Sequence, residues 1–283
     1  MRARPTPKPA RIVALLGAAG ITVGLALVVV GSVSPTDDPP AGSRGDGILR
    51  IASANLAFDN PRSREVSAVI GKLDADVLVV LEWTGGNLLP ERASGPAWRV
   101  ALDEPRPGAH GVLVLVRRTL EAEAALEPTP VPGPCPMPIA TARIHTGGEW
   151  VSLLGVHAPP PIPECEDTNL PTLRFLAGVV EHGRLATDLG AARRGDRVIL
   201  AGDLNAPPPS PGLGWLRGAG LVDTYADRRW LPRGTWASTV GPHLVRLDYV
   251  LVSREVPVLG SWAVDLPGSD HRAVIADLRI PES

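Results

Sequence analysis

The residues with the clearest potential for chemistry are Asp203 and Asn205. The run Val198 to Ala201 is apolar, rich in β-branched residues and too short for a helix, which predicts a strand buried on both faces. Gly202 lets the chain turn, and the Pro-rich stretch after Asn205 cannot continue a sheet. Two residues apart in extended chain, Asp203 and Asn205 offer a carboxylate and an amide on one face, which suits a water molecule or a metal ion. The alternative is a strand-end turn in which both side chains bond their own backbone.

Other polar side chains also stand where apolar runs end or begin. They are all of types that bind metals or transfer protons: Asn55, Glu82, His157, Asp248, Asp270 and His271. A helix pattern between the runs that end at Asn55 and Glu82 predicts a βαβ unit, which places both residues at one edge of a parallel pair. An isolated histidine such as His157 is more often structural, and Asp248 inside a buried strand is costly unless it has a partner.

The elements that must position these residues follow from hydrophobic periodicity. Strands are predicted over 48–56, 77–81, 112–116, 139–144, 150–157, 198–201, 246–252 and 273–278, and helices over 63–73, 170–189 and 215–221. Residues 139–144 and 150–157 should form a hairpin about Gly147 and Gly148. We expect Arg174, on the second helix, to point toward the site, and Trp236 to be an exposed aromatic in a loop.

The amino terminus predicts a membrane segment. Residues 1–11 carry four basic and no acidic side chains, residues 12–33 carry no charge, and residues 34–47 form a polar linker. A span of about 20 residues matches the hydrocarbon core of a bilayer, and the basic flank places the amino terminus in the cytoplasm. We therefore expect a single-pass membrane protein with an extracytoplasmic domain over 48–283. The alternatives are a cleaved signal peptide, which also exports the domain, and a buried soluble helix.

The charge balance of the folded part disfavours tight binding of long nucleic acids. The chain of 283 residues is long enough for one domain with a large core. Leaving out the five basic and three acidic residues of the first 47 positions from the 28 and 30 in the chain gives 23 basic and 27 acidic residues, a net charge of −4. Proteins that hold nucleic acid through phosphate contacts alone are usually basic.

Taken in order, the polar residues resemble the endonuclease/exonuclease/phosphatase superfamily. The resemblance spans Leu49 to Ile280 and rests on Asn55, Glu82, His157, Gly202-Asp203-Leu204-Asn205, Asp248 in Leu-Asp-Tyr, and Ser269-Asp270-His271. Single motifs of this kind are weak, whereas the ordered set is specific. It implies a four-layered α/β sandwich, with two mixed β-sheets packed face to face and helices outside, and Mg²⁺-dependent hydrolysis of phosphoesters.

The same resemblance implies a role for each residue. Glu82, with Asn55 and Asp270, would hold Mg²⁺, with Mn²⁺ as an alternative ion, because such ions prefer oxygen ligands. Asp203, positioned by Asn205, would orient or deprotonate the attacking water. His271, charged through its pairing with Asp248, would donate to a phosphate oxygen, and His157 would donate a second bond.

Several functions fit these residues. The substrate is a phosphoester: a nucleic acid cleaved by a nuclease or phosphodiesterase, or a lipid head group or small molecule cleaved by a phosphatase. A non-catalytic surface binding protein on the same fold is a third hypothesis, which the intact set of residues disfavours. The membrane is the other partner, through residues 12–33, and nothing in the sequence indicates a protein partner.

The two cysteines, Cys135 and Cys165, are expected to form a disulfide. Export to an oxidising compartment permits one. In the predicted hairpin, residues whose numbers sum to about 295 face each other, which places Cys135 opposite about Pro160, close to Cys165. The alternatives are two free thiols or a metal site.

Overall fold

The computed structural model describes residues 47–86, 98–127, 135, 137–165, 168–182, 197–225, 234–237 and 242–281. The predicted segments 1–11 and 12–33 lie outside these residues, as do residues 34–46 of the predicted linker. Within the described ranges, no helix has the length and apolar character needed to cross a bilayer.

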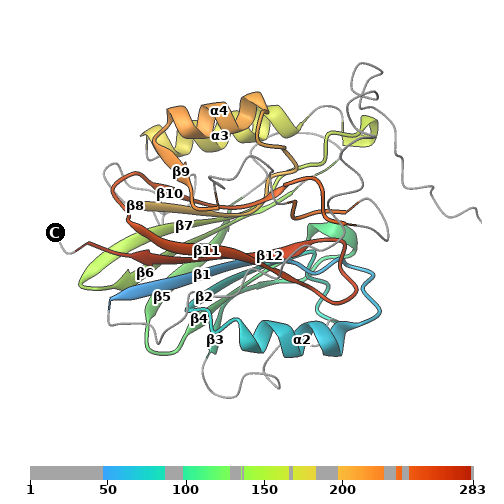
Figure 1. Ribbon diagram of the computed structural model, residues 1–283, viewed down its shortest axis with the longest axis horizontal. Helices are drawn as coiled ribbons and strands as arrows, with labels where there is room; N and C mark the ends of the chain where they lie inside the picture. The colour runs from blue at the N-terminus through green and yellow to red at the C-terminus, as the bar shows by residue number, and fades with distance from the viewer. Residues whose placement is uncertain are drawn as a thin grey trace, which may run out of the picture.

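Two mixed sheets of six strands form the body of the molecule (Figure 1). The first sheet has the order β11-β12-β1-β2-β4-β3. Its strands are β1 (Ile48–Asn55), β2 (Val77–Leu81), β3 (Trp98–Glu104), β4 (Val112–Arg117), β11 (Val258–Asp265) and β12 (Arg272–Arg279). Only the pair β1 and β2 is parallel, and it is the βαβ unit that the sequence predicts.

The second sheet has the order β5-β6-β7-β8-β10-β9. Its strands are β5 (Glu121–Glu127), β6 (Ile139–Thr146), β7 (Glu149–His157), β8 (Arg197–Asp203), β9 (Leu221–Asp223) and β10 (Asp248–Ser253). Here β7 and β8 are the parallel pair. The register of β6 on β7, with Ile139 opposite Val156, confirms the predicted hairpin.

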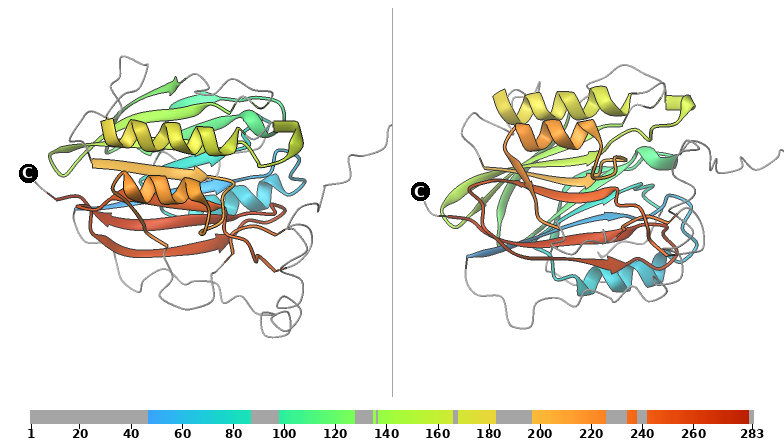
Figure 2. Two further views of the ribbon diagram at one scale, coloured as in Figure 1. Left: turned by 90° about the horizontal axis from the view of Figure 1, so that it is seen from above. Right: turned by 45° about the horizontal axis from the view of Figure 1, so that its top comes forward.

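Helices cover the outer face of each sheet and complete four layers (Figures 1 and 2). Helix α2 (Ser63–Lys72) packs on the first sheet, and α3 (Asn169–His182) and α4 (Pro211–Gly218) lie side by side on the second. One buried apolar cluster lies between the sheets, and a further cluster lies under the helices on each side. The predicted four-layered α/β sandwich is confirmed.

Two predicted helices have different bounds in the structure. Residues 170–182 of the predicted helix 170–189 belong to α3, and 183–189 lie outside the described residues. The helix predicted at 215–221 instead begins at Pro211, because Ser210 caps it by accepting a hydrogen bond from the Leu213 amide. It ends at Gly218, and Leu221 already begins β9.

Candidate active site

Strand ends from both sheets bring the polar residues to one edge of the sandwich. In the second sheet, Asp203 at the end of β8 lies opposite His157 on β7 and opposite Asp248 on β10. In the first sheet, Asn55 ends β1 opposite Leu81, and Glu82 follows directly. Because the parallel strands of each pair end at the same edge, residues far apart in the sequence meet there.

Asp203 lies at the centre of this group and is almost completely buried. One carboxylate oxygen, Oδ2, lies 3.6 Å from Nε2 of His157 and 3.7 Å from Nε2 of His271, and it accepts a hydrogen bond of 3.3 Å from the Asn55 amide. The other oxygen, Oδ1, accepts from the backbone amide of Asn205 at 2.8 Å. One oxygen is thus held by the backbone, and the other faces two imidazoles.

Gly202 allows β8 to approach β7 closely enough for this arrangement. A Cβ atom at Gly202 would lie 1.8 Å from the carbonyl oxygen of Val156, which no side chain can occupy. The glycine in Gly-Asp-Leu-Asn is therefore required by packing between the strands that carry His157 and Asp203.

His271 and Asp248 form a buried pair behind Asp203. Nδ1 of His271 lies 2.9 Å from Oδ2 of Asp248, which is fully buried. Although burial lowers the pKa of His271, the charges of Asp248 and Asp203 and the hydrogen bond that Nδ1 donates to Asp248 raise it to about 10. Burial raises the pKa of Asp203 to about 6, against the opposing charge of His271. Near neutral pH the charged imidazolium of His271 therefore lies beside the ionised carboxylate of Asp203.

His157 has its ring orientation set by a loop of the other sheet. Its Nδ1 lies 2.9 Å from the carbonyl oxygen of Ala109, which can only accept, so Nδ1 carries the hydrogen. This leaves Nε2 directed at Asp203. The carbonyl of Ala109 thus keeps a hydrogen on Nδ1, so Nε2 accepts hydrogen bonds in the neutral ring and donates them only in the charged ring.

Glu82 and Asn55 are the part of the site that the first sheet supplies at the ends of β2 and β1. Asn55 donates from Nδ2 to Glu82 Oε1 at 3.1 Å as well as to Asp203, and Glu82 Oε2 accepts from the Phe58 amide at 2.9 Å. Glu82 has a φ of 56°, a left-handed conformation that is uncommon for a side chain of this type. Such strain is typical of functional sites, where the surrounding structure compensates for it.

The structure groups the candidate metal ligands in two ways. Ligand atoms of Asp203, Asp248 and His271 lie within 4.8 Å of one another. Glu82 and Asn55, two of the residues expected to bind the metal, are joined by a hydrogen bond, and Asn55 also contacts Asp203. Asp270, the third, accepts a hydrogen bond of 3.2 Å from Nε1 of Trp236.

Two expectations about side chains near the site are wrong. Arg174 does not point to the site: its guanidinium lies 5.7 Å from the ring centre of Trp215, on the outer face of α3 and α4. Trp236 is only partly exposed, because its indole nitrogen bonds Asp270 and its backbone forms bridges to Val245 and His271. The sequence identified the loop around Trp236 but not this packing.

Several supporting residues have no clear signal in the sequence. Thr235 is fully buried, and its hydroxyl accepts hydrogen bonds of 3.0 Å from the amides of Leu247 and Asp248. Asn60 and Asn169 each hold two loops at the site together. Their side chains bond main-chain carbonyls, which any sequence supplies, so no pattern of residue types identifies the partners.

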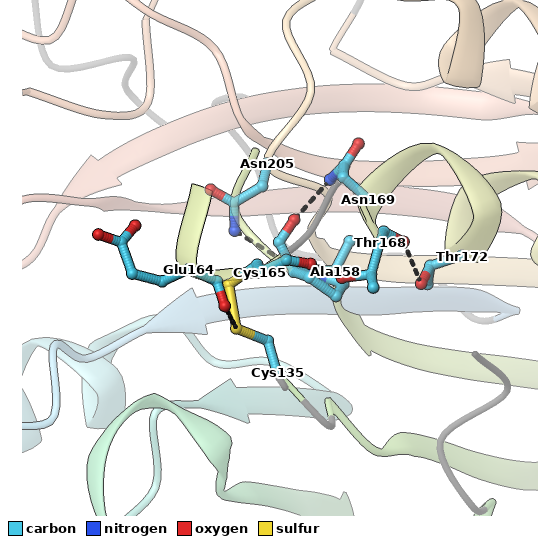
Figure 3. The surroundings of a disulfide bond; sticks show 9 residues. Cys135, Ala158, Glu164, Cys165, Thr168, Asn169, Thr172 and Asn205 are labelled. Atoms are coloured by element: carbon cyan, nitrogen blue, oxygen red, sulfur yellow. Dashed lines mark hydrogen bonds between the residues drawn. A yellow bond between two sulfur atoms is a disulfide. The ribbon is translucent and has the colours of Figure 1, made fainter. Parts of the chain in front are cut away.

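A disulfide between Cys135 and Cys165 lies beside the loops of the second sheet (Figure 3). The two Cα atoms are 5.2 Å apart. Cys165 is buried in a short 3₁₀ turn, Pro163–Cys165, between β7 and α3. The disulfide thus restrains the loop that follows His157.

The model of a known family matches residues 52–271, most of the chain. The chain belongs to the Endonuclease/Exonuclease/phosphatase family. Members of this family are generally hydrolases of phosphoesters. The search of curated proteins finds no significant match.

Solved structures share the fold of the family at low identity. An endonuclease/exonuclease/phosphatase family protein from Bacteroides thetaiotaomicron has a TM-score of 0.64 at 16% identity, covering 83% of this chain and 99% of its own. A mannosyl-6-phosphatase of the same species has a TM-score of 0.63 at 17%, covering 82% and 100%. TDP2 of D. rerio, complexed with a single-strand DNA product, has a TM-score of 0.64 at 17%, covering 83% and 100%.

Proposed function

We propose that this chain is a Mg²⁺-dependent phosphoester hydrolase of the phosphodiesterase or nuclease type. The observation that carries the proposal is the position of Asp203 Oδ2, 3.6 and 3.7 Å from two imidazoles and in contact with the amide of Asn55. An acceptor for a water proton and donors for a phosphate oxygen are thereby gathered at one point, as in-line displacement requires.

The donor set near Glu82 fits a magnesium ion. Mg²⁺ prefers oxygen ligands and keeps several waters, so one or two carboxylates suffice. Glu82 is partly exposed, and Asn55 places its amide between the carboxylates of Glu82 and Asp203. Glu82 and Asn55, with Asp270 nearby, would hold the ion, which when bound offsets negative charge on the phosphate.

The group of Asp203, Asp248 and His271 suits proton transfer better than magnesium. Its nitrogen ligand is one that Mg²⁺ does not favour, and an ion there would compete with the hydrogen bond of 2.9 Å between His271 and Asp248. In this assignment Asp203 accepts the proton of the attacking water. His271, kept charged by Asp248, donates a hydrogen bond to a phosphate oxygen, and His157 donates a second one from Nε2 when both of its ring nitrogens carry a hydrogen.

A phosphatase acting on lipid head groups or small phosphoesters is the second candidate. It is supported by the net charge of −4 over residues 48–283, which disfavours long polyanions, and by the likeness to a mannosyl-6-phosphatase. TDP2 bound to a DNA product supports the nuclease type. A non-catalytic binding protein is less consistent with a buried aspartate held between two histidines.

We also propose that residues 12–33 anchor the protein in the cell membrane in a single pass, with the catalytic domain on the extracytoplasmic side. The absence of charge over 22 positions and the basic residues before them support this, and a disulfide is compatible with export. Secretion after signal cleavage is the alternative. Protease added to intact cells should digest the domain but leave a membrane-bound fragment, and release of the whole chain into the medium would contradict anchoring.

The test of the activity is a panel of substrates with and without metal. The panel contains a single-stranded oligonucleotide, duplex DNA, RNA, phospholipid vesicles, a sugar phosphate and a chromogenic phosphodiester. We expect Mg²⁺-dependent hydrolysis of at least one class by the wild-type chain, and hydrolysis slower by about 100-fold or more by Asp203→Asn. Equal hydrolysis in excess chelator would refute the metal-dependent mechanism. The absence of hydrolysis across the whole panel would contradict the proposal that the chain is a phosphoester hydrolase.

A further inference from the structure

Two buried asparagines lie outside the set of residues assigned to chemistry, one in each half of the site. Asn60 lies between β1 and α2, and Asn169 is the first residue of α3. Their exposed fractions are 8% and 5%, which is unusual for asparagine unless its amide is well bonded. Each uses a single amide nitrogen to bond two main-chain carbonyls from different loops.

Asn169 joins the two loops of the second sheet. Its Nδ2 donates to the carbonyl of Pro159 at 2.7 Å and to that of Leu204 at 3.0 Å. Pro159 is two residues after His157, and Leu204 directly follows Asp203. The amide therefore sets the spacing between the ends of β7 and β8, where Nε2 of His157 faces Asp203.

Asn60 makes the same connection in the first sheet. Its Nδ2 donates to the carbonyl of Leu56, directly after Asn55, at 2.9 Å and to that of Pro267, in the loop before His271, at 3.0 Å. Its Oδ1 accepts from the Arg62 amide at 2.8 Å. Gly268, with a φ of 80°, packs so close that a Cβ there would lie 2.2 Å from this Oδ1.

The loop that Asn169 contacts is held at two more points (Figure 3). Asn205 donates from Nδ2 to the carbonyl of Ala158 at 2.9 Å. Further along, the disulfide fixes Cys165, whose carbonyl accepts from the amide and hydroxyl of Thr168, the residue before Asn169. The disulfide and the hydrogen bonds of Thr168 thus restrain the start of α3. The backbone of Asn169 is therefore held in place while its side chain bonds the two loops.

We propose that Asn60 and Asn169 are positioning residues, each of which holds two catalytic loops of one sheet at the spacing needed for phosphoester hydrolysis. The proposal rests on the proposed function, because it concerns the same site. Neither side chain touches the substrate. Asn60 sets the positions of Asn55 and His271, and Asn169 sets the positions of His157 and Asp203. Each asparagine affects turnover through these positions.

The test uses Asn60→Asp and Asn169→Asp in the full-length chain. The substitution keeps the shape, and in Asn60 the acceptor for the Arg62 amide, but replaces the donor by an acceptor that faces two carbonyls. Asn169 is the first residue of α3, where a carboxylate is favourable, and Asn60 lies three residues before the start of α2, so the variants should fold. Asn60→Ala and Asn169→Ala remove the bonds without adding charge.

Thr172→Val is the matched control. Thr172 is as buried as Asn169, lies one turn further along α3, and donates one hydrogen bond of 2.8 Å to the Thr168 carbonyl. Its loss should lower stability without moving either loop. In the asparagine variants we expect kcat to fall about 10- to 100-fold, while KM stays within about threefold of the wild-type value. In Thr172→Val we expect kcat to change by less than about twofold.

The proposal is overturned if the asparagine variants lose no more kcat than Thr172→Val at the same loss of melting temperature. Crystal structures decide it independently of activity. In Asn169→Asp the distance of 3.6 Å between His157 Nε2 and Asp203 Oδ2 should change by at least about 0.5 Å, while in Thr172→Val it should not. An unchanged distance in both variants would refute positioning by Asn169, whereas a wild-type chain without activity would refute only the proposed function.

Discussion

Removing the charge of Asp248 should confine activity to acidic pH. In Asp248→Asn the amide oxygen can still accept from Nδ1 of His271, so the ring keeps its place while the negative charge is lost. The wild-type enzyme needs Asp203 deprotonated and His271 protonated. Since their pKa values are about 6 and about 10, its rate should rise through pH 6 and stay level up to about pH 9.

The size of the effect follows from the pKa of His271. The difference between about 10 and the ordinary value of 6.5 corresponds to about 5 kcal/mol in favour of the imidazolium, and Asp248 supplies both a charge and a hydrogen bond to it. Once Asp248 is neutral, burial still lowers the pKa of His271 while the charge of Asp203 still raises it, so the pKa should fall toward its ordinary value of 6.5. With a pKa of 6.5, about 3% of the rings are charged at pH 8, so the rate at that pH should be lower by up to about 30-fold.

The assay is kcat/KM on the best substrate of the panel between pH 5 and pH 9. Asp248→Asn should lose activity progressively above about pH 6.5, and wild type should not. Asp277→Asn is the control, because Asp277 is also buried and pairs with Arg50 at the other end of the first sheet. A level profile up to pH 9 in Asp248→Asn would refute the assignment of His271 as a cationic donor, as would the same acidic shift in Asp277→Asn.

Three further results are expected. Glu82→Gln should raise the Mg²⁺ concentration for half-maximal activity by at least about tenfold, because it removes a negatively charged ligand, and an unchanged titration would remove Glu82 from the metal site. Asp203→Asn and His271→Ala should each lower kcat by about 100-fold or more at unchanged circular dichroism, since both groups act on the transition state, and a folded variant with near-full turnover would exclude that residue. Replacing Cys135 and Cys165 by serine should lower the free energy of unfolding by about 3–4 kcal/mol in denaturant titrations, because the disulfide closes a loop of 30 residues. Alkylation without reductant should leave the mass of the exported wild-type chain unchanged, and two alkylated thiols would contradict the disulfide.

The sequence alone identified the strands at the centre of each sheet. Strands β2, β4 and β8 are buried along nearly their whole length, so each is a continuous apolar run with a clear beginning and end. The polar residue that ends such a run is easy to recognise, which is why residue order by itself points to Glu82 and Asp203. The turn at Gly147 and Gly148 also determined the register of β6 on β7.

The strands that sequence reasoning missed are the four at the sheet edges. They are β3, β5, β9 and β11, and their residues are mostly half-exposed or exposed. An edge strand packs on one side only and carries charged residues such as those in β5, so it lacks the apolar run of a central strand. Local pattern reflects burial, and burial at an edge depends on which strand lies next to it.

Only the tertiary structure decided how the site is assembled. Asn55 ends a strand of the first sheet, His271 directly precedes another strand of that sheet, and His157 ends a strand of the second. Their contacts with the single oxygen Asp203 Oδ2 therefore depend on how the two sheets pack. Asn60 and Asn169 bond carbonyl groups, which every residue has, so the sequence contains no signal for their partners. Residue types and their order reveal which chemistry is available, whereas the distances that make it usable arise from packing between elements far apart in the chain.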